Sequence, residues 1–284
     1  MLGSLIESAR NDKPPIEGES FSIDYAVSGT GPTVVLVPGS CSTGAAWQPV
    51  IAAWAKRFRC VTTSLLGYGR TAERRTAADA DIAHEAEAVE SVIWRAGGGA
   101  HVVGHSFGGL VAIAVALRKR VPLASLTIIE APAVELLRAA DEHRHYRAFR
   151  QMSDAYFAAY RRGETHAIAS MIDFYGGADT FGSWPRRVRE YAVRTTPVNL
   201  LDWAGAYGFA LSPAVLAKID NPTLVLMGSK SHPAVRRANE LLSMSIPGGY
   251  AVSIAGATHF MMATHARDVA RLIGRHVASA DAWR

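Results

Sequence analysis

A serine flanked by glycines near the middle of the chain is the first candidate for chemistry. The segment 104–108 reads Gly-His-Ser-Phe-Gly, and it lies between an apolar run at 100–103, typical of a strand, and a run at 110–117, typical of a helix. A serine on such a sharp turn has strained backbone angles, and small flanking residues let the turn close. Its hydroxyl is exposed at the helix N-terminus, where the helix dipole favours developing negative charge. The pattern therefore predicts Ser106 as a nucleophile, and the flanking elements disfavour a chance match in a loop.

Strands and helices must alternate along the chain to position this serine. Helices are predicted from apolar residues at helical spacing, and one of them is expected to open on a capping box at 76–79 and to end at 97–99. Continuous apolar strands between amphipathic helices predict an α/β fold with a mostly parallel central sheet, covered by helices on both faces. The predicted strands are 21–27, 33–37, 60–65, 100–103, 123–130, 223–227 and 250–254.

One long segment interrupts this alternation. Residues 131–217 show no strand pattern, and they contain 13 of the 24 aromatic residues of the chain. We predict an inserted helical cap, or lid, at 131–217 and a core made of 1–130 and 218–284. The aromatic residues either fill the cap's own core or form an apolar roof over a substrate pocket, and both can hold. Trp184 and Trp203 are candidates for that roof.

With the serine turn, the strand order and the helical insert in view, the chain resembles an α/β-hydrolase with a cap domain from about residue 21 to 278. The segment 35–40, Val-Leu-Val-Pro-Gly-Ser, is similar to the family's strand followed by His-Gly-x, with Pro38 in place of the histidine. The resemblance implies an oxyanion hole made by the backbone N–H groups of Ser40 and Phe107. Main-chain donors require no particular side chain, so Pro38 alone does not undermine the hole.

The resemblance also implies a histidine base and a carboxylate. His259, in the segment 256–260 after the last strand, lies where the family places its base. The usual acid position holds Ser231, which cannot stabilise an imidazolium with charge. Either the acid has moved to Glu130, at the end of the strand after the serine helix as in some cap-bearing members, or a Ser–His dyad works slowly or not at all. Glu130 could instead be a strand-end carboxylate bound to a cap arginine or to backbone. Asp220 precedes its strand and lies at the opposite end.

A serine rather than an aspartate at the turn indicates acyl transfer. The expected function is a serine hydrolase, esterase-like, that acts on a carboxylic ester, thioester or lactone through an acyl-enzyme intermediate. The alternatives are a cofactor-free C–C bond hydrolase or perhydrolase of the same fold, and a catalytically impaired small-molecule-binding or receptor protein. The expected substrate is a small or medium apolar acyl compound. Its pocket is expected to include His105, Cys41, Trp184 and Trp203.

Composition narrows the remaining classes. The net charge of +5 comes from scattered basic residues without a basic stripe, which disfavours nucleic-acid binding. No apolar run approaches the ~20 residues of a membrane span, and residues 1–15 do not read as a signal peptide. Two cysteines make no disulfide framework, and a cytoplasmic location is the default expectation. Metal-ligand spacings and a phosphate-binding loop are absent from the sequence, so we expect no metal and no cofactor. The oligomeric state stays open, a homo-oligomer included.

Overall fold

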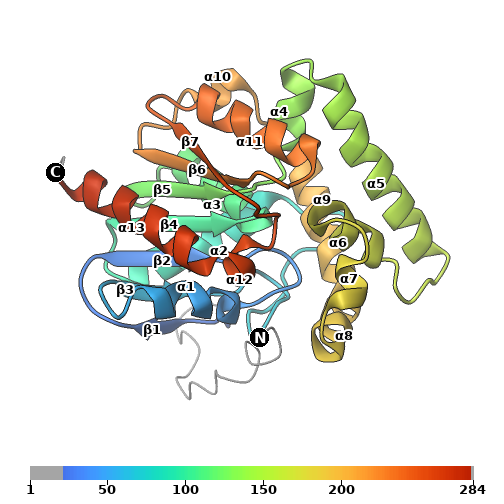
Figure 1. The fold of residues 1–284 in the computed structure, drawn as a ribbon, viewed down its shortest axis with the longest axis horizontal. Helices are drawn as coiled ribbons and strands as arrows, with labels where there is room; N and C mark the ends of the chain where they lie inside the picture. The colour runs from blue at the N-terminus through green and yellow to red at the C-terminus, as the bar shows by residue number, and fades with distance from the viewer. Residues whose placement is uncertain (1–21, 283–284) are drawn as a thin grey trace.

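The computed structural model describes residues 22–282 (Figure 1). Its centre is a seven-stranded sheet with the order β1-β3-β2-β4-β5-β6-β7. All neighbouring strands run parallel except β1, which is antiparallel to β3 at one edge. This confirms the predicted α/β fold with a mostly parallel sheet. The strands are β1 (Ala26–Ser28), β2 (Thr33–Val37), β3 (Arg59–Thr62), β4 (Ala100–His105), β5 (Leu123–Ile129), β6 (Thr223–Gly228) and β7 (Tyr250–Ile254).

Helices cover both faces of the sheet, and the alternation of side chains along the strands divides the core in two. On β2, Val34 and Leu36 pack toward the helices of one face, whereas Val35 and Val37 pack toward those of the other. The first face is covered by η2 (Gly44–Trp47), α1 (Gln48–Ala53), α12 (Met261–Thr264) and α13 (Ala266–Ala282). The second is covered by α2 (Ile82–Arg95), α3 (Phe107–Arg118) and α11 (Pro233–Ser245).

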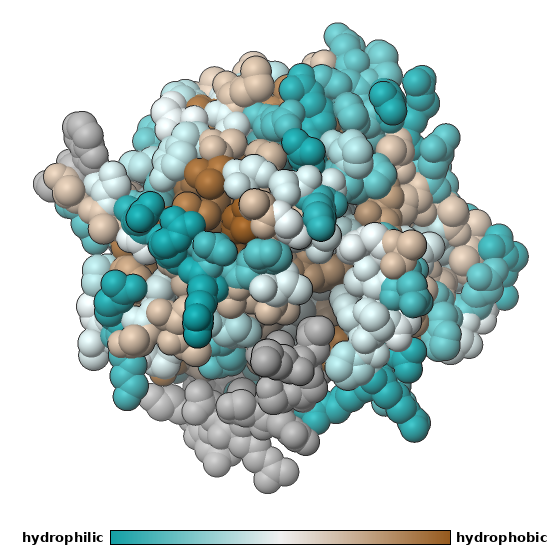
Figure 2. Space-filling model, in the orientation of Figure 1, coloured by the Kyte–Doolittle hydropathy of each residue, from teal (hydrophilic) through white to brown (hydrophobic). Residues whose placement is uncertain are grey.

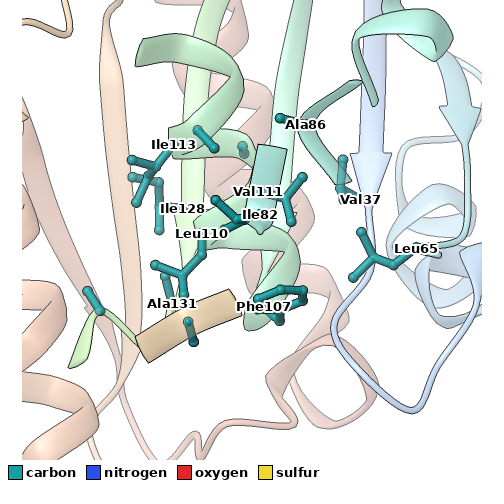
Figure 3. Close-up of a cluster of buried hydrophobic side chains, with 14 of the residues drawn as sticks. Val37, Leu65, Ile82, Ala86, Phe107, Leu110, Val111, Ile113, Ile128 and Ala131 are labelled. Atoms are coloured by element: carbon teal, nitrogen blue, oxygen red, sulfur yellow. The ribbon is translucent and has the colours of Figure 1, made fainter. Parts of the chain in front are cut away.

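The serine helix α3 is buried on nearly every side. Figure 3 shows Leu110, Val111 and Ile113 of this helix among side chains from α2 and from strands β2 and β5. Ten consecutive residues from Phe107 to Ala116 are buried, which explains why the sequence there is apolar without a polar stripe. A rigidly packed helix holds the residue at its N-terminus in one place.

The segment between β5 and β6 consists of helices and connecting loops without a strand, and it stands beside the sheet rather than in it (Figure 1). Its inner side carries an aromatic cluster in which Phe149 contacts Phe174, Tyr175 and Trp203. The outer side of α5 is hydrophilic (Figure 2). The helices of this segment are α4 (Val134–Ala139), α5 (His143–Arg161), α6 (Ala169–Gly176), α7 (Thr180–Ser183), α8 (Arg186–Arg194), α9 (Thr196–Gly208) and α10 (Pro213–Leu216).

The local predictions at 76–79 and at 21–27 were wrong. The proposed capping box at 76–79 does not begin a helix, because Thr76 and Asp79 pair with each other in an isolated bridge. Helix α2 begins at Ile82 instead, where the Asp81 carboxylate accepts a hydrogen bond from the Ala83 N–H at 2.8 Å. The strand predicted at 21–27 is limited to Ala26–Ser28 among the described residues. Residue 21 and the N-terminal residues before it lie outside the described residues.

No helix within residues 22–282 is both long enough and apolar enough to cross a membrane. Cys41 and Cys60 are both free thiols. Burial raises the pKa of Cys60 to about 11, and burial together with the nearby Asp202 carboxylate raises the pKa of Cys41 to about 12. Both side chains are therefore neutral at physiological pH.

Candidate active site

Ser106 lies at the turn between β4 and α3 in a backbone conformation that few residues with a Cβ adopt, with φ 53° and ψ −127°. Its N–H donates to the Ile129 carbonyl at 2.8 Å, and its own carbonyl accepts from the Gly109 N–H at 2.8 Å. A Cβ on Gly104 would collide with the Gly108 carbonyl, and a Cβ on Gly108 would collide with the Pro38 carbonyl. The two glycines are thus required by close backbone approach, which is the physical basis of the sequence pattern.

His259 follows β7 and precedes α12, and its side chain is 4% exposed. Its Nδ1 lies 2.9 Å from Oε2 of Glu130. The ring also packs against Tyr175 from α6, with 4.2 Å between ring centroids. Since the carboxylate accepts the proton on Nδ1, the ring is held as the tautomer whose Nε2 carries a lone pair. His259 and Ser106 line the same cavity.

Glu130 comes directly after β5 with φ 48° and is completely buried. Besides His259, its carboxylate has two donors at the end of β6 and the turn after it. The Gly228 N–H donates to Oε1 at 2.6 Å, and the Ser231 hydroxyl donates to the same oxygen. Ser231, which occupies the usual acid position, therefore donates a hydrogen bond to the Glu130 carboxylate, and Glu130 makes the contact with His259. These hydrogen bonds compensate the burial of the Glu130 carboxylate, so no arginine of the helical segment is needed as its partner.

His105, the neighbour of the nucleophile, holds the loop that carries the histidine. Its Nε2 donates to the His259 carbonyl at 3.0 Å. Burial, together with the nearby His259, lowers the pKa of His105 to about 3. The ring is thus neutral at working pH, and it lines the cavity without competing as a base.

The loop after β2 lies against the nucleophile. A Cβ on Gly39 would come within 2.8 Å of the Ser106 Cβ, which places this backbone directly beside the serine. Within residues 22–282, neither the Ser40 amide nor the Phe107 amide has a protein acceptor, and both residues line the cavity. Two unpaired N–H groups at this position suit a negatively charged oxygen. Cys41 follows with φ 57° and also lines the cavity.

The cavity has a volume of about 400 Å³ and lies between the carboxyl ends of the strands and the helical segment. Its wall includes Trp184 and Trp203, as the sequence predicts, and no lysine or arginine belongs to the part of the wall that the structure describes. Further apolar residues complete it: Met171, Ile172, Tyr175, Val188, Ala206, Phe260 and Met262. Three exposed members mark its mouth between α7 and α12: Ser183, Ala263 and Thr264.

The sequence analysis did not predict one charged residue of the cavity wall. Asp202, on α9, is buried, and its carboxylate forms a 2.8 Å ion pair with the Arg75 guanidinium. Arg75 also pairs with Glu73 at 2.8 Å and lies 3.1 Å from Glu85. A single aspartate in the otherwise uncharged helix 196–208 is the only sign of this cluster that the sequence carries.

The buried Glu85 predicts a measurable dependence of stability on pH. Burial is the main cause that raises its pKa to about 8, and it outweighs the opposite effect of the Arg75 guanidinium, which lies 3.1 Å from Oε1. Between about pH 4.5 and about pH 8 the folded protein keeps a proton that the unfolded chain releases, so this contribution to stability is lost as the pH rises. We expect Glu85→Gln to flatten the fall in Tm between about pH 5 and about pH 8 in calorimetry.

Glu87→Gln is the matched control, because this residue lies on the same helix and its side chain is 44% exposed. It should leave the pH dependence of the wild type unchanged. Parallel Tm curves for wild type and Glu85→Gln would show that Glu85 does not carry a raised pKa.

Comparison with known proteins shows that the chain is similar to hydrolases. A model of the alpha/beta hydrolase family matches residues 34–272. A pimeloyl-[acyl-carrier protein] methyl ester esterase from Vibrio atlanticus is 39% identical over 100 residues, which are 34% of this chain and 36% of that protein. The match thus spans about a third of the length of this curated relative. The polyketide synthase ThaQ from Burkholderia thailandensis is 27% identical over 84% of this chain and 11% of its own length.

Solved structures share the fold. A thermophilic esterase from Thermogutta terrifontis superposes with a TM-score of 0.70 at 22% identity, covering 92% of this chain and 94% of that one. An enol-lactonase from Burkholderia xenovorans has a TM-score of 0.70 at 19% identity, covering 91% and 97% of the two chains.

Proposed function

Because this chain belongs to the alpha/beta hydrolase family, we propose that it hydrolyses a carboxylic ester or a related acyl compound through an acyl-enzyme on Ser106. The observation that carries the proposal is the 2.9 Å contact between His259 Nδ1 and a buried Glu130 carboxylate, beside the cavity that Ser106 lines. Serine, imidazole and carboxylate in this relation are the parts of a nucleophilic triad. That the relatives from several Vibrio species are named esterases agrees with the proposal.

The proposed reaction has two halves. His259 Nε2 accepts the proton of the Ser106 hydroxyl while Oγ attacks the carbonyl carbon, and the carbonyl oxygen becomes an oxyanion. The backbone N–H groups of Ser40 and Phe107 donate to that oxyanion, each donor worth about 3 kcal/mol in comparable enzymes. Collapse breaks the bond to the leaving alcohol, which takes the proton from His259. Water then attacks the acyl carbon while the same imidazole accepts its proton. The bond between the acyl carbon and Ser106 Oγ breaks, Oγ takes the proton back from His259, and the carboxylic acid is released.

In this proposal Glu130 keeps Nδ1 of His259 protonated and stabilises the imidazolium that forms. The hydrogen bonds from Gly228 and Ser231 hold the carboxylate in place. The alternative of a catalytically impaired binding protein was motivated by Ser231 at the usual acid position and by Pro38 in place of the family's histidine. Glu130, after the neighbouring strand β5, supplies a carboxylate that bonds to His259, so we favour the enzyme.

We propose an uncharged acyl group of small or medium size as the substrate portion that enters the cavity. The supporting features are a volume of about 400 Å³, a mostly apolar wall, and the lack of cationic side chains in the described wall. An ionised carboxylate in such a site would lose its hydration without gaining a counter-charge. The identity of the alcohol or thiol that leaves is not part of the proposal.

A series of p-nitrophenyl esters from acetate to laurate tests this function. We expect kcat/KM to be highest for a medium acyl chain and to fall at both ends of the series. The decisive pair is p-nitrophenyl hexanoate against the half-ester of adipic acid, which has the same chain length and an ionised end. We expect the charged ester to be at least about 10-fold poorer. Equal or better turnover of the charged ester would contradict the proposed substrate class, and no turnover of any ester would contradict the function.

A further inference from the structure

We propose that Asp202 of the helical segment is a positioning residue that holds the oxyanion loop, the turn at residues 39–41, from across the cavity. The inference rests on the proposed function, in which the Ser40 N–H is an oxyanion donor. It adds a part that lies outside the Ser106–His259–Glu130 arrangement and outside the strands that carry it. The helical segment then takes part in building the oxyanion hole as well as the pocket wall.

The first observation is that both oxygens of the Asp202 carboxylate accept hydrogen bonds from protein side chains. Its Oδ2 accepts from the Ser40 hydroxyl at 2.6 Å and from the Tyr68 hydroxyl at 2.6 Å. Its Oδ1 accepts from Arg75 Nη1 at 2.8 Å. The side chain is 2% exposed although the residue lines the cavity. With three donors and a counter-charge in place, the carboxylate serves the protein's own loop rather than a substrate group.

The second observation is that the loop needs such an anchor. Cys41 has φ 57°, a left-handed conformation that a residue with a Cβ adopts only when its surroundings impose it. Gly39 is pressed against the Cβ of Ser106, so the loop has no room to move toward the nucleophile. The Ser40 hydroxyl bond to Asp202 fixes the loop from its other side. The direction of the Ser40 N–H is set by these contacts together.

The third observation is that Asp202 is itself held by the core. Its partner Arg75 donates to the Leu66 carbonyl at 3.2 Å and to both carboxylate oxygens of Glu73. Helix α9, Arg75 and the loop after β2 therefore form one connected polar unit.

The test compares Asp202→Asn and Ser40→Ala with wild type on the best p-nitrophenyl ester. In Asp202→Asn, an NH₂ group replaces one carboxylate oxygen, so the side chain cannot accept hydrogen bonds from all three donors. Ser40→Ala removes the hydroxyl that bonds to Asp202 and leaves the backbone N–H of residue 40 in place. We expect each variant to lower kcat about 10- to 100-fold, below the full loss of an oxyanion donor, with KM changed less than about twofold. The affinity for a trifluoromethyl ketone analogue, which forms the oxyanion, should fall by the same factor as kcat/KM, whereas that for the methyl ketone should not.

The double variant separates a shared role from two unrelated ones. If Asp202 acts through Ser40, the double variant should be no slower than Asp202→Asn alone, because both changes break the same contact. Ser153→Ala is the control, since it likewise removes one serine hydroxyl, here on the helical segment, where it bonds to Tyr207 at 2.8 Å, and it should keep wild-type kcat. Should Asp202→Asn fail to fold by circular dichroism, Ser40→Ala decides alone, because it leaves the Arg75 pair intact.

Wild-type kcat in Ser40→Ala, an effect on KM alone, or effects that multiply in the double variant would overturn the inference. Failure of the proposed function has a different signature, because wild type itself would then show no turnover of the esters. An active wild type with an unaffected Ser40→Ala variant rejects only the positioning role.

Discussion

Glu130→Gln is expected to lower kcat for ester hydrolysis by about 10⁴-fold, with the fold and the cavity unchanged. The reason lies in the hydrogen bonds of the carboxylate. Oε1 accepts from Gly228 and Ser231, so the amide oxygen of a glutamine takes that side and its NH₂ group faces His259 Nδ1. Two donors cannot face each other, and His259 is forced into the tautomer whose Nε2 carries the proton. That ring cannot accept the proton of Ser106.

Steady-state kinetics with p-nitrophenyl hexanoate checks this, with Tm measured alongside. Glu135→Gln is a suitable control, because this buried glutamate pairs with Arg138 on α4 and is not part of the cavity wall. A rate for Glu130→Gln within about threefold of wild type would remove Glu130 from the triad and favour a Ser–His dyad.

The same geometry predicts a rescue. Because the Ser231 hydroxyl already touches the Glu130 carboxylate, an acid introduced at 231 reaches the same region beside His259. The double substitution Glu130→Ala/Ser231→Asp is expected to recover at least about 10-fold of the activity lost in Glu130→Ala. Recovery would show that the histidine needs a carboxylate rather than a particular strand end. No recovery at equal Tm would show that the position after β5 has a role beyond charge.

Ser106→Ala is expected to have the other large effect, a loss of kcat of about 10⁴-fold or more. The oxyanion donors and the cavity remain, so a residual rate above that in water is expected. Substrate affinity should change little. The dissociation constant of the unreactive methyl ketone analogue measures it. Ser153→Ala again provides a buried serine whose loss should leave turnover intact. A Ser106→Ala enzyme with more than about a tenth of wild-type kcat would exclude Ser106 as the nucleophile.

Local patterns in the sequence were sufficient for much of the fold. Strands β2 and β7 have the predicted bounds, Thr33–Val37 and Tyr250–Ile254, because each is a short β-branched or apolar run between turn residues. The serine turn was predictable for the same reason: its glycines are required by backbone contacts that any such turn makes. The family resemblance then implied that Ser106, Glu130 and His259 follow strands whose carboxyl ends share one edge. The structure places the Glu130 carboxylate 2.9 Å from His259, beside the cavity that Ser106 lines.

What the sequence could not predict depends on contacts between distant segments. The 2.6 Å bond between Ser40 and Asp202 joins residues 162 positions apart, across the packing of α9 on the core. The Ser231 hydroxyl can bond to the Glu130 carboxylate only because β5 and β6 are neighbours in the sheet. Strand β3 ends at Thr62, earlier than predicted, and the Thr63 side chain bonds to the Asp24 carbonyl at 2.8 Å beyond its end. Tertiary contacts override local propensity at such places.

Labelling with a fluorophosphonate tests the central claim most directly, because the reagent reacts with a serine only when base and oxyanion donors have activated it. Wild type, Ser106→Ala and heat-denatured wild type would be incubated with the probe, and the modified peptide would be identified by mass spectrometry. The account predicts one adduct per chain in native wild type, on the peptide that contains Ser106, and none in the other two samples. A native wild-type protein without an adduct, or an adduct on another residue, would contradict it.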